Sequence, residues 1–509
     1  MVAIVTEKFR IHNASQFKES FSEASASTYY MLIGKPTAYD SDTSGGTDTS
    51  PPTPNDDVGS EFYIWDSAIG AKKISSTDVS NVVSRRNWTN GTTYDMYEHD
   101  ISSTNTSTSG ASNLYDATFY FMTSDNRVYK VLDNGSGAAY SGTEPTSTSN
   151  SPFELGGYVL KYMLTVSASD EAKFFTSDFI PVATDSTVSA NATDGAIESF
   201  IVTGGSGYTD GTYFTPVYGD GTNSGKSTGA ILKLIVSGGV IQAFGLTDGT
   251  DSTVQTAGTE YTFATINLDS GYTFSDAALT SASAMGGSGG SVKVVISPKG
   301  GHGFNAIEEL GGHFVMARVT MTGAENDDLS AGNDFRNLAL CIDPTTFGTS
   351  TIASSSTARL SYAIKLESGA GTFLPDETVI QASTGAVGKV VEYDATNRIL
   401  YVIQERYNGH GTSSVTSPTV STGVGQGSGN RFSGANAITN TGGSGASGTP
   451  DAAADAAVTL ANGGSITFAD GYANPELEPD SGDIVYVENR RPIFRSASQT
   501  EDIKLVVEF

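Results

Sequence analysis

Cysteine is almost missing from this sequence. Cys341 is the single cysteine among 509 residues, so no disulfide can form within the chain and no cysteine-based metal site can be built. Disulfides belong to oxidising compartments, and a chain without them is typical of proteins that fold in a reducing one. Cys341 lies in the apolar run 338–342, where we expect a small buried core residue.

Positive charge is also scarce. The chain has 28 lysine and arginine residues against 56 aspartate and glutamate residues, a formal net charge of −28. Because affinity for nucleic acid comes largely from lysine and arginine, this balance argues against a nucleic-acid partner. Such acidity is typical of a surface that keeps a protein soluble. The alternatives are adaptation to a saline environment and complementarity to a basic partner.

Long hydrophobic runs are absent. No apolar stretch approaches the roughly 20 residues that a membrane-spanning helix needs. Glu7, Lys8 and Arg10 interrupt the start of the chain, so no secretory signal peptide is expected. The sequence therefore predicts a soluble protein without membrane insertion.

Catalytic motifs are missing as well. The sequence has no nucleophile elbow, no phosphate-binding P-loop and no dinucleotide-binding glycine fingerprint after a strand. The histidines do not show the helical spacing of a zinc hydrolase; they are His12, His99, His302, His313 and His410. Two of them flank Glu308 and Glu309, but the glycines around His302 favour a turn over a metal site. We expect no catalytic residue, no metal and no cofactor, and the protein is interpreted as not an enzyme.

Three Asp-Gly pairs are compatible with calcium binding, because aspartates on tight turns present oxygen ligands to hard cations. They begin at Asp210, Asp220 and Asp248. Their spacing is irregular, which favours hairpin turns instead.

Glycine, serine and threonine dominate what is present. With 58 glycines and 38% hydrophobic residues, the composition favours many short strands joined by turns. We predict a mainly β, multi-domain protein with a β-sandwich-like core and few short helices. The expected strands include 2–6, 29–33, 117–122, 128–132, 158–166 and 314–318, and the expected helices begin at Asn13 and cover 62–69 and 79–83.

The last stretch of the chain, 481–509, predicts two strands. Apolar residues at alternate positions from Ile503 to Phe509, including Leu505 and Val507, indicate a strand with one buried face. The apolar run 484–487 predicts a strand that is buried on both sides. Between them, Pro492 biases the preceding residue toward extended geometry, so we expect a long turn with Arg490 and Arg491 on an exposed corner.

Two further stretches are typical of inserted modules. Residues 196–296 are rich in glycine, and Ser-Gly-Tyr-Thr occurs at 206–209 and again at 270–273, which predicts an all-β module with tyrosines packed on glycine turns. Residues 372–407 predict a small β-barrel with three strands. Residues 408–465 have few large apolar side chains and are interpreted as a loop or flexible segment.

Several motifs, in order along the chain, resemble the baseplate wedge protein 8 family of T4-like phages. They are Ala3-Ile-Val-Thr-Glu-Lys-Phe-Arg10, Arg85-Arg-Asn-Trp88, Gly157-Tyr-Val-Leu-Lys-Tyr-Met-Leu164, Asn333-Asp-Phe-Arg-Asn-Leu-Ala-Leu-Cys-Ile-Asp-Pro344, Val485-Tyr-Val-Glu-Asn-Arg-Arg-Pro-Ile493 and Gln499-Thr-Glu-Asp-Ile503. The resemblance implies a structural virion protein in the tail baseplate, assembled in the host cytoplasm. It also implies a homodimer that contacts other wedge proteins and rearranges when the tail contracts.

The motifs and the composition shifts together predict five segments. The wedge core is expected at 1–190, 301–345 and 471–509. The glycine-rich module is expected at 191–300, and the barrel module with the flexible segment at 346–470.

Arginine and tryptophan near two of the motifs are candidate interface residues, because both are favoured anchors in protein interfaces. Internal structural pairing and ligand binding are the alternatives. The candidates are Arg85, Arg86, Trp88, Arg490, Arg491 and Arg495. Two other functions stay open: a tail-associated module that binds host glycans through exposed tyrosines, and a tail hydrolase, which would need a cleft with paired carboxylates.

Overall fold

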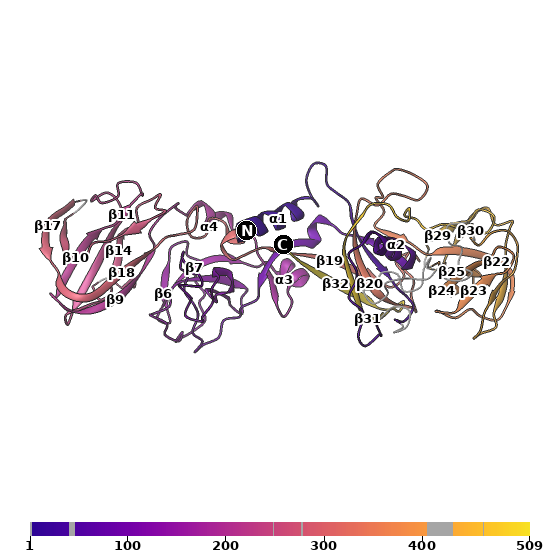
Figure 1. The fold of residues 1–509 in the computed structure, drawn as a ribbon, viewed down its shortest axis with the longest axis horizontal. Coiled ribbons are helices and arrows are strands. Elements are labelled where there is room, and N and C mark those ends of the chain that lie inside the picture. Colours follow the sequence, from indigo (N-terminus) through magenta and orange to yellow (C-terminus); the bar gives the residue numbers. More distant parts are fainter. Residues whose placement is uncertain (1–2, 40–45, 248, 276–277, 405–430, 462) are drawn as a thin grey trace. The chain divides into compact units, whose positions relative to one another are not determined.

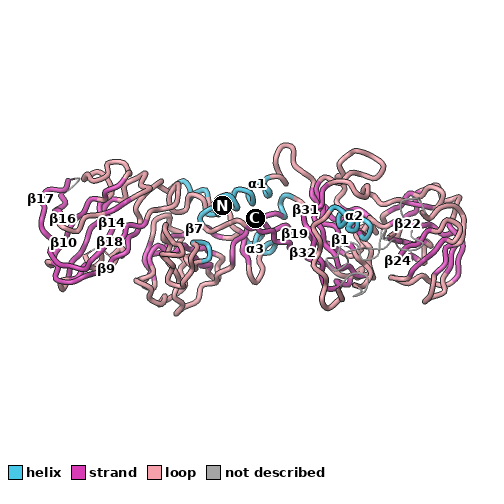
Figure 2. Tube along the Cα trace, in the orientation of Figure 1, coloured by secondary structure: helices cyan, strands magenta, loops and turns pink. Residues whose placement is uncertain are grey.

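The computed structural model describes residues 3–39, 46–247, 249–275, 278–404, 431–461 and 463–509. Strands predominate over helices in this part of the chain (Figures 1 and 2), which confirms the mainly β class. The helices are α1 (Glu7–Glu19), α2 (Val58–Ser67), α3 (Ala168–Phe174), α4 (Ser186–Ala190) and α5 (Ala306–Glu309). Not one of these helices combines the length and the apolar character needed to cross a membrane.

Two compact units make up the chain. The first contains the residues up to Lys18 together with Ser80–Met316 and Val506–Phe509, and the second contains Glu19–Val79 and Ala317–Leu505. Each unit therefore combines segments that are distant in the sequence. The five-segment division stays a prediction.

One antiparallel sheet of the first unit has the order β4-β5-β7-β6. β4 (Tyr120–Met122) and β5 (Arg127–Asp133) form the expected hairpin, and β7 (Tyr158–Thr165) is the expected strand, paired on its other side with β6 (Phe153–Leu155). Every residue of β7 before Thr165 is buried. Its aromatic and aliphatic side chains belong to hydrophobic cores on both sides of the sheet.

The glycine-rich segment forms a second all-β part of the first unit. Its strands are β9 (Ser199–Tyr208), β10 (Gly211–Pro216), β11 (Tyr218–Gly219), β12 (Ile231–Ser237), β13 (Val240–Ile241), β14 (Thr253–Thr256), β15 (Ala264–Thr265), β16 (Ser270–Ser275), β17 (Ala278–Ala284) and β18 (Gly286–Val295). Leu132 and Val159 share its hydrophobic core, so the segment also packs on β5 and β7. As expected, Tyr208 lies over glycines: a Cβ on Gly287 or Gly290 would come within 2.4 or 2.5 Å of its side chain.

A five-stranded antiparallel sheet in the second unit has the order β21-β2-β1-β20-β31. Its strands are β21 (Thr357–Arg359), β2 (Ala68–Lys73), β1 (Tyr29–Gly34), β20 (Asp334–Ile342) and β31 (Asp483–Phe494). β1 is buried along its whole length, and Cys341 on β20 is a buried core residue, as expected. β31 lies at the edge of this sheet.

The predicted barrel is present and closes through strands outside the predicted range. β23 (Thr378–Gln381), β24 (Ala386–Asp394) and β25 (Ile399–Ile403) are the three expected strands. β26 (Ile438–Asn440) and β27 (Ser447–Pro450) continue the sheet, and β22 (Tyr362–Ala370) pairs with both β27 and β25, which completes the ring. The interior holds Leu366, Val379, Val390, Leu400 and Val402. The short strands β28 (Ala457–Thr459), β29 (Ser465–Thr467) and β30 (Tyr472–Ala473) follow in the chain.

Three expectations near the N-terminus are wrong. Residues 3–6 form no strand, and Ile4 is 86% exposed, because no strand of the described chain pairs with this segment. Helix α1 begins at Glu7, so Asn13 lies inside the helix and does not cap it. The segment expected as a helix at 79–83 is strand β3 (Val79–Ser84), which pairs with β8 (Phe179–Pro181) and suits its β-branched valines.

Three expectations in the last third are wrong in part. Residues 484–487 belong to a strand at a sheet edge, with Val485 49% exposed, because only β20 pairs with it in the described chain. β31 also continues through the expected turn to Phe494. β32 (Thr500–Glu508) confirms the final strand and buries Leu505, but Val507 and Phe509 are only half-buried. Of the expected loop 408–465, residues 408–430 and 462 lie outside the described chain, and the described part contains β26, β27 and β28.

Candidate interface

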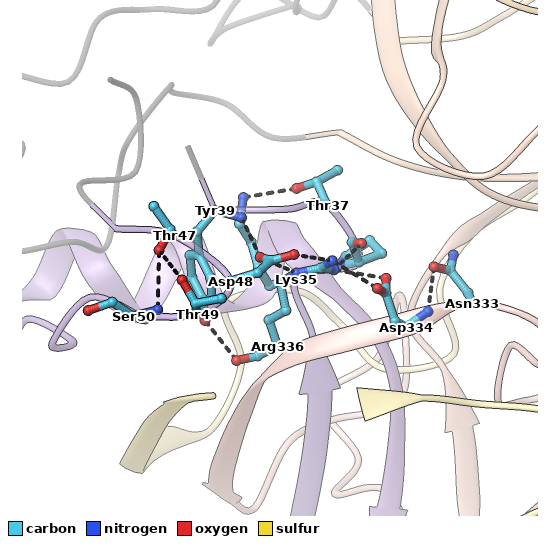
Figure 3. Close-up of polar contacts among 11 residues, drawn as sticks. Lys35, Thr37, Tyr39, Thr47, Asp48, Thr49, Ser50, Asn333, Asp334 and Arg336 are labelled. Atoms are coloured by element: carbon cyan, nitrogen blue, oxygen red, sulfur yellow. Dashed lines mark hydrogen bonds and ion pairs between the residues drawn. The ribbon is translucent and has the colours of Figure 1, made fainter. Parts of the chain in front are cut away.

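Arg336 lies on strand β20, and its guanidinium binds the loop around residue 48 to this strand. Its Nε and Nη2 donate to the two carboxylate oxygens of Asp48 at 2.8 and 2.9 Å. Nη1 and Nη2 donate to the two oxygens of Asp334 at 2.8 Å each, and Nη1 also donates to the Pro36 carbonyl at 2.6 Å. All five N–H groups are therefore used (Figure 3), and the side chain is buried.

The two carboxylates set the charge state of this cluster. Burial opposes the charged form of Arg336, but the hydrogen bonds to Asp48 and Asp334 raise the pKa of its guanidinium. The hydrogen bond from Arg336 lowers the pKa of Asp48. Bidentate pairing of this kind is directional, so it fixes the loop in one position.

Tyr39 occupies the gap between β20 and β31 beside this cluster. Its buried hydroxyl donates to the Arg336 carbonyl at 2.8 Å, and the backbone amide of Arg490 interacts with the same hydroxyl. In the ladder, Phe335 pairs with Ile493 and Asn337 pairs with Asn489. One residue of β20 therefore faces three residues of β31, and 490–492 form a bulge.

Asn489 attaches the same loop to β31. Its Nδ2 donates to the Pro52 carbonyl at 2.9 Å, and its Oδ1 accepts from Nδ2 of Asn337 at 2.8 Å. The bulge is thus held on one side by the sheet and on the other by the loop. We call residues 490–492, with Tyr39 and Arg336 beneath them, the arginine bulge.

The arginine bulge presents its charged side chains to solvent. Arg491 and Pro492 are exposed, and the Arg490 side chain is 41% exposed, with Nε 3.4 Å from Oε1 of Glu488. The expectation of an exposed corner is confirmed, although the corner is a bulge within a strand and not a long turn. Whether these residues contact a partner stays a prediction.

Arg495, the next candidate, is only 1% exposed. It donates to the carbonyls of Ser330 at 2.8 Å and Gly323 at 2.6 Å, and it pairs with Oε2 of Glu501 at 3.1 Å. The side chain is engaged within its own unit, which corresponds to the internal-pairing alternative.

The candidates near residue 86 are also engaged within their unit. Arg86 donates to the carbonyls of Ala117 and Tyr115, and its guanidinium lies 4.4 Å from the ring centroid of Tyr120. Arg85 donates to the carbonyl of Thr176 at 2.8 Å and lies over the ring of Phe175. Trp88 is half-buried and packs edge-on against Tyr140. These contacts tie the chain after β3 to its neighbours and leave the interface role a prediction.

Sequence reasoning missed the residues that build the bulge. Arg336 and Asp334 lie in the Asn333-Asp-Phe-Arg motif, but the sequence does not indicate a role for them. Tyr39 and Asp48 carry no sequence signal, because their partners on β20 lie almost 300 residues away.

The described residues contain a cavity but no group of three histidine, cysteine or carboxylate side chains placed to hold a metal ion. The cavity, about 290 Å³, is lined by Asp328, Glu392, Asp394, Arg359 and Tyr401 among others. Burial raises the pKa of Asp328 and Glu392. His302 and His313 belong to the first unit, and His313 Nδ1 is 3.5 Å from Oε2 of Glu7.

The comparisons with known proteins concern the first part of the chain. Residues 3–135 match the model of a protein family described as Bacteriophage T4, Gp8. No individually curated protein matches the chain. The matched region starts before α1 and ends just after β5, and it includes the candidates Arg85, Arg86 and Trp88.

Proposed function

Residues 3–135 belong to the family of the phage baseplate wedge protein Gp8, and from this premise we propose that the chain links neighbouring wedge proteins in the baseplate of a contractile tail. The observation that carries the proposal is this family match. In this role the protein is structural and acts mechanically, without a catalytic step.

The architecture supports a linking role in two ways. The sheets have separate hydrophobic cores, and close-packed protein interiors resist deformation. The arginine bulge adds a positive, exposed feature on an otherwise acidic chain of net charge −28. Since arginine is a favoured interface anchor, we propose that Arg490 and Arg491 contact an acidic surface of a neighbouring wedge subunit.

The proposal includes self-association and a location. The protein forms a homodimer, is assembled into tails in the host cytoplasm, and stays in the baseplate of the virion. During contraction it holds the neighbouring wedge proteins in fixed relative positions while the baseplate rearranges. Light scattering of the purified chain at micromolar concentration tests the first point, and a strictly monomeric mass would contradict it.

The main experiment locates the protein in assembled tails. Phage tails carrying a tagged copy of the chain are purified, and the tag is located by electron microscopy. Labelling at the baseplate is expected. Labelling along the tail tube, on the fibres or in the head would contradict the proposal.

A variant pair separates the linking role from folding. Arg490→Ala with Arg491→Ala is expected to enter tails less efficiently than the wild type. Lys226→Ala, which removes an exposed positive charge from the other unit, is the matched control and is expected to enter tails normally. Equal incorporation of both variants would contradict a contact through the arginine bulge.

A further inference from the structure

Two aromatic rings are exposed on one face of the β11–β15 ribbon. Tyr218 is 40% exposed and Phe263 is 62% exposed. Tyr218 pairs with Thr265, and Gly219 pairs with Ala264. Phe263 immediately precedes β15, and continuing the alternation of the strand by one residue places it on the side of Thr265, diagonally opposite Tyr218.

The burial pattern of the ribbon confirms this alternation. Val217, Ala264 and Ile266 turn toward the hydrophobic core of the glycine-rich segment. Tyr218, Asp220, Phe263 and Thr265 are exposed. The two rings therefore share the outer face with the carboxylate of Asp220; diagonal neighbours of this kind lie roughly 7–8 Å apart.

The Tyr218 ring packs on a glycine. A Cβ added to Gly225 would come within 2.9 Å of two ring carbons of Tyr218, so the ring rests directly on the glycine backbone. Gly225 itself is held by a hydrogen bond from its N–H to the Val217 carbonyl at 2.9 Å. Only glycine permits this close approach, and its φ of +69° also favours glycine.

Two carboxylates close to the ribbon in the sequence supply hydrogen-bond acceptors. Asp220 accepts from the backbone N–H groups of Thr262 and Phe263 at 2.9 and 3.0 Å, and from the Thr262 hydroxyl. These donors lower the pKa of Asp220 to about 2, so the carboxylate is charged at neutral pH. Glu260 on the neighbouring turn accepts from the hydroxyl of Thr222. The two backbone donors use both lone pairs of Asp220 Oδ1, so Asp220 Oδ2 and the Glu260 carboxylate are the acceptors left for a ligand.

We propose that Tyr218 and Phe263 form a binding surface for a neutral glycan, with Asp220 and Glu260 accepting hydrogen bonds from its hydroxyl groups. A pyranose ring has an apolar face that packs on an aromatic ring and an edge of hydroxyl donors, and this surface offers both complements. The two carboxylates repel anionic ligands. An apolar protein partner would have to bury them without a counter-charge, which is costly.

The experiment measures glycan binding by the full chain. The probes are immobilised neutral oligosaccharides of glucose, galactose and N-acetylglucosamine, with sialylated oligosaccharides as the anionic comparison. We expect neutral glycans to bind and sialylated glycans to bind more weakly. Failure of every neutral oligosaccharide to bind, or a preference for the sialylated ones, would overturn the proposal.

Matched variants separate ring stacking from general apolar contact. Tyr218→Leu and Phe263→Leu keep an apolar side chain but remove the ring, and each is expected to weaken binding roughly tenfold. Tyr218→Phe keeps the ring and is expected to bind within about twofold of the wild type. Phe494→Ala removes a phenylalanine that is 61% exposed in the other unit and should have no effect. Equal binding by the leucine variants would overturn the proposal.

This inference does not depend on the wedge function. The leucine variants change only exposed side chains, so they are expected to melt and to enter tails like the wild type. If glycans do not bind but tails assemble normally, the glycan-binding proposal is wrong and the proposed wedge function is unaffected.

Discussion

Lys130 and Glu309 form an ion pair inside the first unit, with Nζ and Oε2 2.7 Å apart and both side chains almost fully buried. Oε1 of the same glutamate accepts from the backbone N–H groups of Gly303 and Asn305. The ammonium also lies 4.0 Å from the ring centroid of Tyr97. Burial lowers the pKa of Lys130, and the nearby Glu309 opposes this effect. Each charge is tolerated in the core because the other is present.

Removing one partner of this pair should be strongly destabilising. Lys130→Met leaves the Glu309 carboxylate buried without a counter-charge, and we expect the free energy of unfolding to fall by about 3–5 kcal/mol. Changing both residues to Met should cost less than Lys130→Met alone, because no charge stays buried. Urea denaturation measures both variants. A double variant less stable than the single one would contradict this account.

The arginine bulge separates residues that stabilise the fold from residues that face solvent. Arg336→Met leaves two partly buried aspartates without their partner, and we expect a loss of about 3 kcal/mol. Tyr39→Phe removes one buried hydroxyl and should cost about 1 kcal/mol. Arg490→Ala with Arg491→Ala should change stability by about 0.5 kcal/mol or less. Thermal melting ranks the three, and a large loss in the last variant would show that the bulge supports the sheet.

Asp133 predicts a pH dependence of stability. Burial raises the pKa of this carboxyl from 3.8 to about 6. The folded state therefore binds the proton more tightly than the unfolded state, so the stabilisation is complete below pH 3.8 and is lost as the pH rises through 6. The loss is at most about 3 kcal/mol.

Asp133→Asn tests this dependence, because asparagine can still accept the hydrogen bond from the Gly135 N–H. Other buried carboxylates act in the same direction, so the informative quantity is the difference between variant and wild type. We expect the variant to be the more stable protein at pH 8 and to lose this advantage at pH 4. Urea denaturation at the two pH values measures it. An equal difference in the free energy of unfolding between variant and wild type at both pH values would contradict the role assigned to Asp133.

Strand β32 should contribute to stability through its buried side chains. Leu505 is 4% exposed, and Leu505→Ala is expected to cost about 2–5 kcal/mol. Val485→Ala, on an exposed position of β31, is the matched control and should cost about 0.5 kcal/mol or less. Truncation after Gln499 removes the whole strand and should abolish cooperative melting. A truncated protein that melts like the full chain would show that β32 is dispensable.

The sequence by itself determined the features that are local. The alternation in β32, the hairpin of β4 and β5, and the three barrel strands β23, β24 and β25 all follow from patterns within about ten residues. The glycine-rich composition predicted the mainly β class, and the ordered motifs predicted the phage family that matches residues 3–135. Periodicity reports which face of a segment is apolar, and this needs no knowledge of its neighbours.

The tertiary structure determined the features of a residue or strand that depend on a partner far away in the sequence. Residues 3–6 have the sequence of a strand, yet no described strand pairs with them. The barrel closes only because β22 pairs with β27, more than 75 residues away. Arg495 is buried and Arg491 is exposed although they are four residues apart, because Glu501 and two carbonyls surround the first and a bulge projects the second. A side chain's role is set by the groups that pack around it, and local sequence does not encode which distant segment supplies them.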